Sequence, residues 1–221
     1  MDQALDLRWK CRQFRILVVD LATVEGSAER GEHDIESQLI FKSNRQFVFH
    51  DSRGFESGSA DEIQKVKNFI AARSATRELS NQLHAIWYCM PTDTTRPLLA
   101  ADEQFFNVSV PVIAIFTKFD GLIKEAFAEL RAGGKSIPDA KTEATERAQA
   151  ILTSNFIGSL NRTKFRPSAF IRMDDMRMED TNCVDLINKT ADSLSDDTLK
   201  LLFVSVQQNN IDLCIANAVH W

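Results

Sequence analysis

Short apolar runs alternate along the chain with longer segments of helical periodicity. Each run is continuously apolar and is bounded by polar residues, which is typical of strands in a sheet that is covered on both faces. A short turn separates the second run from the third, so these two predict an antiparallel hairpin. The pattern predicts six strands, over residues 14–19, 38–41, 46–50, 85–89, 112–116 and 169–171.

Helical patterns lie between these strands and after the last one. Residues 59–62, Ser-Ala-Asp-Glu, have the form of a capping box, and apolar residues at helical spacing follow them. Strands that alternate with helices predict an α/β fold with a mostly parallel central sheet flanked by helices. Further helices are expected over residues 102–106, 122–130 and 140–152, the last two separated by Gly133-Gly134 and Pro138, and over a long final stretch from about Ser195 to Leu213.

Composition restricts the classes of partner. The 26 basic and 31 acidic residues give a formal charge of −5, which argues against binding to nucleic acid. No apolar run approaches the roughly 20 residues that cross a bilayer, and the start of the chain does not have the pattern of a secretory signal. The four cysteines are scattered without a C-x-x-C pair, which predicts reduced thiols in a cytoplasmic protein.

Two polar motifs come directly after predicted strands, where ligands bind in open α/β sheets. In the first, Asp51 is followed three residues later by Gly54. Such an Asp can hold Mg²⁺, usually through a water, and a Gly backbone N–H can approach a phosphate closely. Taken alone, this motif is also that of an ordinary turn. His50 adjoins Asp51, but strand alternation places it on the opposite face and favours a structural role.

The second motif is Thr117-Lys118-Phe119-Asp120, directly after the fifth strand. The carboxylate of Asp120 can accept two hydrogen bonds from the N1–H and the exocyclic amine of guanine, a pair of donors that adenine does not offer. The methylenes of Lys118 can cover the face of the base while its ammonium stays in a polar setting. The tetrapeptide therefore predicts a guanine-binding loop.

With these motifs the chain resembles a G domain of the Ras-like P-loop GTPase superfamily and, more narrowly, a group of fungal G-domain proteins. The resemblance is carried by residues 29–35, 47–56, 84–89 and 112–120. It implies a G-domain-like unit over residues 14–221, preceded by an extension over residues 1–13 and ending in a helical segment from about residue 181. It also implies GTP or GDP as ligand, with Mg²⁺ as cofactor.

The resemblance assigns individual roles by position. Asp51 and Gly54 match the element that serves magnesium and the γ-phosphate, and Thr117, Lys118 and Asp120 match the guanine element. Ser27 stands in for the threonine of the first switch. The last base-contacting loop of the family falls near residues 173–175, where the match is loose.

The chain departs from the family after the first strand. The family carries G-x-x-x-x-G-K-[S/T] there, whereas this chain continues Asp-Leu-Ala-Thr-Val-Glu-Gly over residues 20–26, with no Lys and no paired Gly. Residues 132–136, Ala-Gly-Gly-Lys-Ser, follow a helix and not a strand, so they do not replace it. Losing about four charge-assisted bonds of ~1.5–3 kcal/mol removes at least ~6 kcal/mol, or roughly four powers of ten in affinity.

Further expectations follow from the missing loop. Phe55 replaces the Gln that many Ras-like enzymes use to orient water, so little or no hydrolysis is expected and no catalytic residue is assigned. The helix behind the loop is also expected to be absent, which would expose one face of the first strand at Ile16 and Val18 or at Leu17 and Val19.

Three interpretations remain open from the sequence. The chain is a G-domain protein that binds guanine nucleotide weakly, or a nucleotide-free pseudo-GTPase that binds a protein partner. Alternatively, it is the incomplete product of a GTPase gene from which the segment for the loop and first helix is lost.

Overall fold

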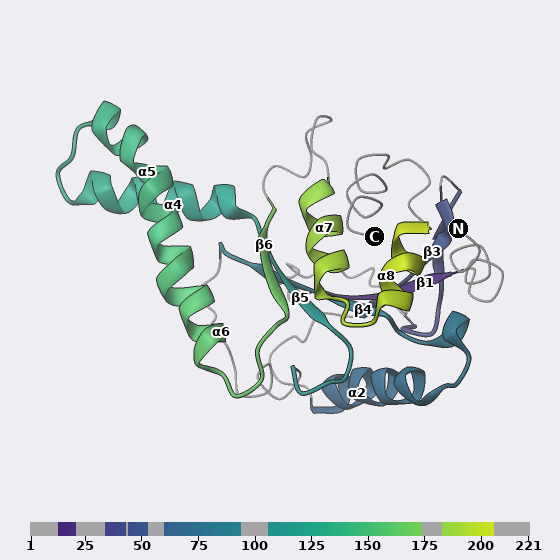
Figure 1. Cartoon of the computed structure of the whole chain (residues 1–221). Coiled ribbons are helices and arrows are strands. Elements are labelled where there is room, and N and C mark those ends of the chain that lie inside the picture. Colours follow the sequence, from purple (N-terminus) through teal and green to yellow (C-terminus); the bar gives the residue numbers. More distant parts are fainter. Residues whose placement is uncertain are drawn as a thin grey trace.

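A six-stranded sheet forms the centre of the molecule (Figure 1). The structure is a computed structural model that describes residues 13–20, 34–42, 44–52, 60–93, 106–173 and 183–205. The strand order is β2-β3-β1-β4-β5-β6, and only β2 runs antiparallel to its neighbour. The strands are β1 (Phe14–Asp20), β2 (Leu39–Phe41), β3 (Asn44–Ser52), β4 (Ala85–Pro91), β5 (Val112–Thr117) and β6 (Ala169–Arg172).

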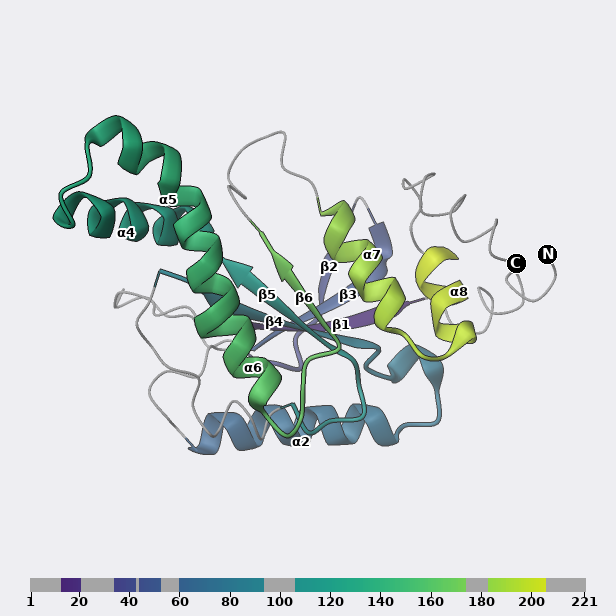
Figure 2. The same ribbon diagram turned by 60° about the vertical axis from the view of Figure 1, so that its left-hand side comes forward.

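These strands confirm all six predicted runs, including the hairpin of β2 and β3. Helices lie on both faces of the sheet, as Figure 2 shows, so the predicted α/β architecture of a mostly parallel sheet between helices is confirmed. The helical elements are α2 (Ala60–Ala75), η1 (Leu79–Asn81), α4 (Phe119–Ala132), α5 (Ile137–Ile151), the π-helix η2 (Leu152–Ile157), α6 (Gly158–Arg162), α7 (Val184–Ser193) and α8 (Asp197–Ser205).

One face of the sheet packs against α2. Leu17 and Val19 of β1 belong to an apolar cluster with Val66 and Phe69 of α2. The same cluster continues through Phe119 and the inner sides of α4 and α5. Beyond that contact, α4 and α5 project together from the β5–β6 side of the molecule (Figures 1 and 2).

The opposite face packs against α7 and α8. Phe203 of α8 is fully buried, and its ring contacts Phe14 and Phe47 at centroid distances of 4.7 and 5.8 Å. Leu186 of α7 and Ile16 of β1 belong to the same cluster. The side chains of β1 that face α7 and α8 are therefore enclosed by apolar contacts.

The expected exposure of β1 is thus wrong. Ile16, Leu17 and Val19 are all fully buried, and Val18 is half-buried against the second cluster. The expectation counted only the helix that would follow β1. It overlooked that α7 and α8, far along the chain, supply cover for this face.

The separation of the two helices at Gly133-Gly134 is confirmed, because α4 ends at Ala132 and Gly133 caps it. Pro138 does not separate them: α5 already begins at Ile137, because proline fits the first turn of a helix, where its missing N–H has no intrahelical role. The Ser136 hydroxyl caps this helix by accepting a hydrogen bond from the Asp139 N–H. The turn before α5 includes Gly134, whose φ of 90° favours glycine.

Several expectations concern residues outside the described ranges. These are the first helix behind β1, most of the helix over residues 102–106, the extension over residues 1–12, and the part of the final helix beyond Ser205. Within the described ranges, no helix has the length and apolar character of a membrane crossing.

The cover provided by α8 predicts a large effect of Phe203→Ala on stability. Removing a fully buried phenylalanine from a close-packed cluster is expected to lower the free energy of unfolding by about 3–5 kcal/mol. Ile137→Ala, which truncates an exposed apolar residue, should change it by less than about 0.5 kcal/mol. Urea denaturation of both variants measures the difference, and equal small effects would contradict the packing described for α8.

Candidate functional site

The carboxyl ends of five parallel strands, β3, β1, β4, β5 and β6, share one edge of the sheet. Both sequence motifs lie there, Asp51 near the end of β3 and Thr117 at the end of β5. Three inter-strand steps of about 4.8 Å separate these two strands by about 14 Å. A single ligand that touched both motifs would have to extend across β1 and β4.

Asp51 lies level with Val18 on the neighbouring strand. By strand alternation it shares a face with Phe47 and Phe49, which belong to the cluster under α7 and α8. Asp51 is half-buried and makes an interaction within the structure. The neighbouring Ser52 hydroxyl is also engaged, because it donates to the Val18 carbonyl at 3.3 Å.

The described residues fit a magnesium ion only in part. No group of three or more His, Cys, Asp or Glu side chains that could hold a metal occurs among them. Mg²⁺ often binds through one or two carboxylates and completes its shell with waters and phosphates. Asp51 would supply the one carboxylate, and a bound nucleotide would have to supply the phosphate oxygens.

The loop after β5 is fixed by backbone hydrogen bonds. The Thr117 carbonyl accepts from both the backbone N–H and the hydroxyl of Thr92, each at 3.0 Å. Lys118 follows with φ 56° and ψ 35°. Among the described residues, no other non-glycine residue has a positive φ. This left-handed conformation costs an ordinary residue about 1–2 kcal/mol. It turns the chain from β5 directly into α4.

Asp93, two residues after the end of β4, supports this turn from the side. Its carboxylate forms an ion pair with the Lys118 ammonium, Oδ2 to Nζ, at 3.3 Å. A Cβ atom placed on Gly121 would lie 2.6 Å from the Cβ of Asp93, so only glycine permits this approach. Asp93 was not predicted from the sequence, although it lies just after an apolar run, as Asp51 does, and that position could have indicated it.

Asp120 lies in the first turn of α4, where the helix dipole favours negative charge. Its side chain is 46% exposed and accepts a hydrogen bond from the Lys124 ammonium at 3.0 Å. That hydrogen bond is the largest cause of a lowered pKa for the Asp120 carboxyl. The group is therefore an ionised, solvent-accessible acceptor at neutral pH.

Phe119, between the two charged residues of the motif, is buried in the core. The guanidinium of Arg172, at the end of β6, lies 4.3 Å from the centroid of the Phe119 ring. Arg172 also donates to the Gln149 side chain of α5 at 2.8 Å. This contact fastens the start of α4 to β6 and α5. The sequence analysis did not single out Arg172, although it directly follows a predicted strand.

The remaining predicted site residues lie outside the described ranges. These are Gly54, Ser27 and residues 174–175 of the loop after β6. Met173, the first residue of that loop, donates its backbone N–H to the Phe116 carbonyl at 2.9 Å.

An open depression of about 790 Å³ lies beside the carboxyl edge, along α5 and η2. It is lined mainly by polar side chains, and the hydroxyls of Thr142, Thr153 and Ser154 are bonded within the helices. Thr142 donates to the Pro138 carbonyl at 3.0 Å, and Thr153 donates to the Gln149 carbonyl at 2.8 Å. The depression thus presents few free polar groups and is not the candidate site.

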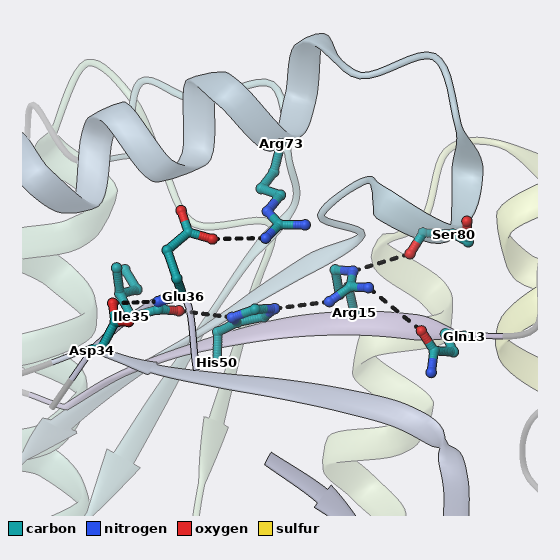
Figure 3. Close-up of polar contacts among 8 residues, drawn as sticks. All are labelled: Gln13, Arg15, Asp34, Ile35, Glu36, His50, Arg73 and Ser80. Carbon is teal, nitrogen blue, oxygen red and sulfur yellow. Dashed lines mark hydrogen bonds and ion pairs between the residues drawn. The ribbon is translucent and has the colours of Figure 1, made fainter. Parts of the chain in front are cut away.

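A buried polar network occupies the face of the sheet toward α2 (Figure 3). The Arg15 side chain is 2% exposed, and its guanidinium donates to the Ser80 carbonyl at 3.0 Å and to Gln13 Oε1 at 3.4 Å. Arg15 Nη1 also lies 3.0 Å from His50 Nε2. The network holds β1, β3 and the segment before β4 together.

His50 has a defined protonation state in this network. Its Nδ1 lies 2.7 Å from the Ile35 carbonyl, so Nδ1 carries the proton and Nε2 accepts from Arg15. Burial, followed by the charge of Arg15, lowers the pKa of His50. Glu36, next to Ile35, pairs with Arg73 of α2 at 2.7 Å (Figure 3). The geometry assigns His50 a structural position, on the strand face opposite Asp51.

His84 is the described residue whose pKa departs most from its ordinary value. Its Nδ1 accepts the Arg15 backbone N–H at 2.8 Å, and its ring stacks on Phe14 at 4.7 Å. The other ring nitrogen, Nε2, is buried without a hydrogen-bond partner among the described residues. Burial is the main cause that lowers the pKa of His84 to about 4. The imidazole is therefore neutral in the folded protein.

The neutral His84 predicts acid-sensitive stability. The pKa of His84 in the folded protein lies below the ordinary value of 6.5, so the unfolded chain binds the proton more readily as the pH falls. The contribution of the neutral imidazole to the free energy of unfolding is therefore complete above pH 6.5 and is lost as the pH falls toward 4. The shift corresponds to a loss on the order of 3 kcal/mol across that range. In His84→Asn the side-chain oxygen retains the acceptor for Arg15 but does not titrate. Unfolding free energies between pH 7 and 4 should show a shallower slope for this variant, and an unchanged slope would contradict the assignment.

The contact between Gly121 and Asp93 predicts that Gly121→Ala destabilises the protein. A methyl group has no room there, so β4 and α4 must shift apart at a cost of about 1–3 kcal/mol. Gly133→Ala is the matched control, because a Cβ at Gly133 meets only ordinary contacts at 3.5 Å. Thermal unfolding should separate the two variants, and equal melting temperatures would disprove the close approach.

Comparison with known proteins finds a likeness in structure at low sequence identity. No family model matches the chain, and no curated protein matches it. Among solved structures, it is similar to the septin GTPase domain from Chlamydomonas reinhardtii at 17% identity, over 74% of this chain and 76% of that one, with a TM-score of 0.32. The fold of this chain is α/β, with a mostly parallel six-stranded sheet flanked by helices.

Proposed function

We propose that the chain is a G-domain protein that binds guanine nucleotide weakly and hydrolyses it little or not at all. The observation that carries the proposal is the ionised, exposed carboxylate of Asp120 at the same sheet edge as Asp51. Thr117, Lys118 and Asp120 would bind the base, and Asp51 would serve the phosphate end.

The Asp120 carboxylate can become available to a guanine base at a small cost in free energy. Asp120 would exchange its contact with Lys124 for two hydrogen bonds from the base. Exposed ion pairs of this kind contribute about 0–1 kcal/mol, so breaking the pair is a small penalty. Lys118 is held over the loop by Asp93, which would keep its aliphatic part in place for contact with the ring.

The phosphate end limits affinity. Asp51 and Gly54 are present in the sequence, but the glycines and lysine of a phosphate loop are absent after β1. The loss of at least ~6 kcal/mol places affinity in the range of tens of micromolar or weaker. Mg²⁺, when bound, would neutralise phosphate charge. Phe55 offers no hydrogen bond to a water, so hydrolysis would be negligible.

A second candidate is a nucleotide-free pseudo-GTPase that binds protein. It is favoured by the ion pairs that Lys118 and Asp120 already make within the chain, with Asp93 and Lys124. The third interpretation, an incomplete gene product, is tested by sequencing the transcript across the codons for Val19 and Asp20.

Titration with fluorescent GDP and GTP, with and without Mg²⁺, separates the first two candidates. Saturable binding in the micromolar range is expected, with a weakening of roughly tenfold or more in Asp120→Ala through loss of hydrogen bonds to a charged acceptor. Asp185→Ala is the matched control, because Asp185 is also an exposed first-turn acid of a helix.

The outcomes are distinct. Binding that Asp120→Ala abolishes and Asp185→Ala leaves intact supports the guanine site. Absence of binding at millimolar nucleotide supports the pseudo-GTPase. Phosphate release over multiple turnovers, well above a protein-free control, would overturn the expected lack of hydrolysis.

A further inference from the structure

The edge strand β2 is unusually apolar for its position. It is an outermost strand of the sheet, and among the described residues only β3 pairs with it. Its three residues, Leu39, Ile40 and Phe41, are 49%, 43% and 59% exposed. Edge strands are commonly kept from pairing with other chains by charges, prolines, bulges or short length. β2 carries no charge and no proline, although it is only three residues long and its register with β3 shifts between Leu39 and Phe41. Its outer edge therefore offers a short apolar stretch for pairing.

The exposed strand is continuous with the core. The Phe41 ring lies 5.7 Å from Phe49 of β3, and Phe49 lies 5.6 Å from Trp87 of β4. An aromatic row thus runs from the middle of the sheet to its edge, where Phe41 is exposed. Ile40 lies on the other face of the strand by alternation. A strand added beside β2 would extend the apolar contacts on both faces.

The charges around β2 indicate the kind of partner. Two acidic residues, Asp34 and Glu36, precede the strand, and two basic residues, Lys42 and Arg45, follow it. All four are exposed. When this segment pairs antiparallel with an identical segment, the acidic end of each meets the basic end of the other. A parallel arrangement would instead bring like charges together.

We propose that β2 is a self-association surface, on which β2 of a second copy of this chain pairs antiparallel about a twofold axis at Ile40. Ile40 then lies opposite Ile40 of the other copy, and Leu39 lies opposite Phe41 in both directions. The two six-stranded sheets become one continuous sheet.

The geometry also determines the size and strength of the assembly. Each copy contributes the same edge to both sides of the contact, so the pairing is self-complementary and stops at two copies. Three residues per strand bury far less than the ~1,600 Å² of a standard interface. The dimer is therefore weak and depends on concentration.

Sedimentation of the full chain from low micromolar to near-millimolar concentration tests the proposal. A monomer–dimer equilibrium is expected for the unaltered protein. Ile40→Lys and Ile40→Glu should each weaken dimerisation by roughly tenfold or more, because they place like charges opposite each other at the axis. An equimolar mixture of the two variants should dimerise again, since the introduced lysine of one copy then faces the introduced glutamate of the other. Ile137→Lys changes another exposed apolar residue, on α5, and should leave dimerisation unchanged.

Each other outcome overturns the proposal. A protein that is monomeric throughout the concentration range has no such contact. Dimers that both Ile40 variants preserve use another surface. Loss of dimers in both variants without recovery in the mixture places another partner or another register on β2, and open-ended oligomers of the unaltered chain exclude a closed twofold pairing. Circular dichroism of each variant verifies that the exposed substitutions leave the fold intact.

Discussion

The burial of β1 on both faces is the constraint on which the rest of the structure depends. This strand lies between β3 and β4, and its side chains alternate between the cluster under α2 and the cluster under α7 and α8. Because the flanking strands run parallel to it, their carboxyl ends reach the same edge. The candidate site exists at that edge only because β1 is held from both sides, by Leu17 and Val19 on one face and Phe14 and Ile16 on the other.

The buried interior and the carboxyl edge of the sheet have different chemistry. In the interior, Arg15 joins His50 and His84 in a buried network in which both imidazoles are neutral. At the carboxyl edge, Asp93, Lys118 and Asp120 are charged and partly exposed. The buried network stabilises one folded arrangement, whereas the exposed charges can change partners at small cost. This division is consistent with a binding role at the carboxyl edge and a structural role for the histidines.

Local pattern predicted the strands and the main helices because apolar runs and helical periodicity are properties of neighbouring residues. It also placed Asp51 and Thr117 at strand ends, where the structure has them. It did not predict that Phe203 would cover Phe14, because that contact joins residues far apart in the sequence. Asp93 and Arg172 were missed for the same reason, since their significance arises only when β4 and β6 lie beside the 117–120 loop. The roles of Gly54 and Ser27 remain sequence-based expectations.

The contact between Gly121 and Asp93 has a mechanical consequence. Where a helix and the end of a neighbouring strand touch with no space for even one methyl group, neither can slide past the other independently. The first turn of α4 and the end of β4 therefore behave as one rigid joint. A displacement of the first turn of α4 toward β4 would therefore push Asp93 as well.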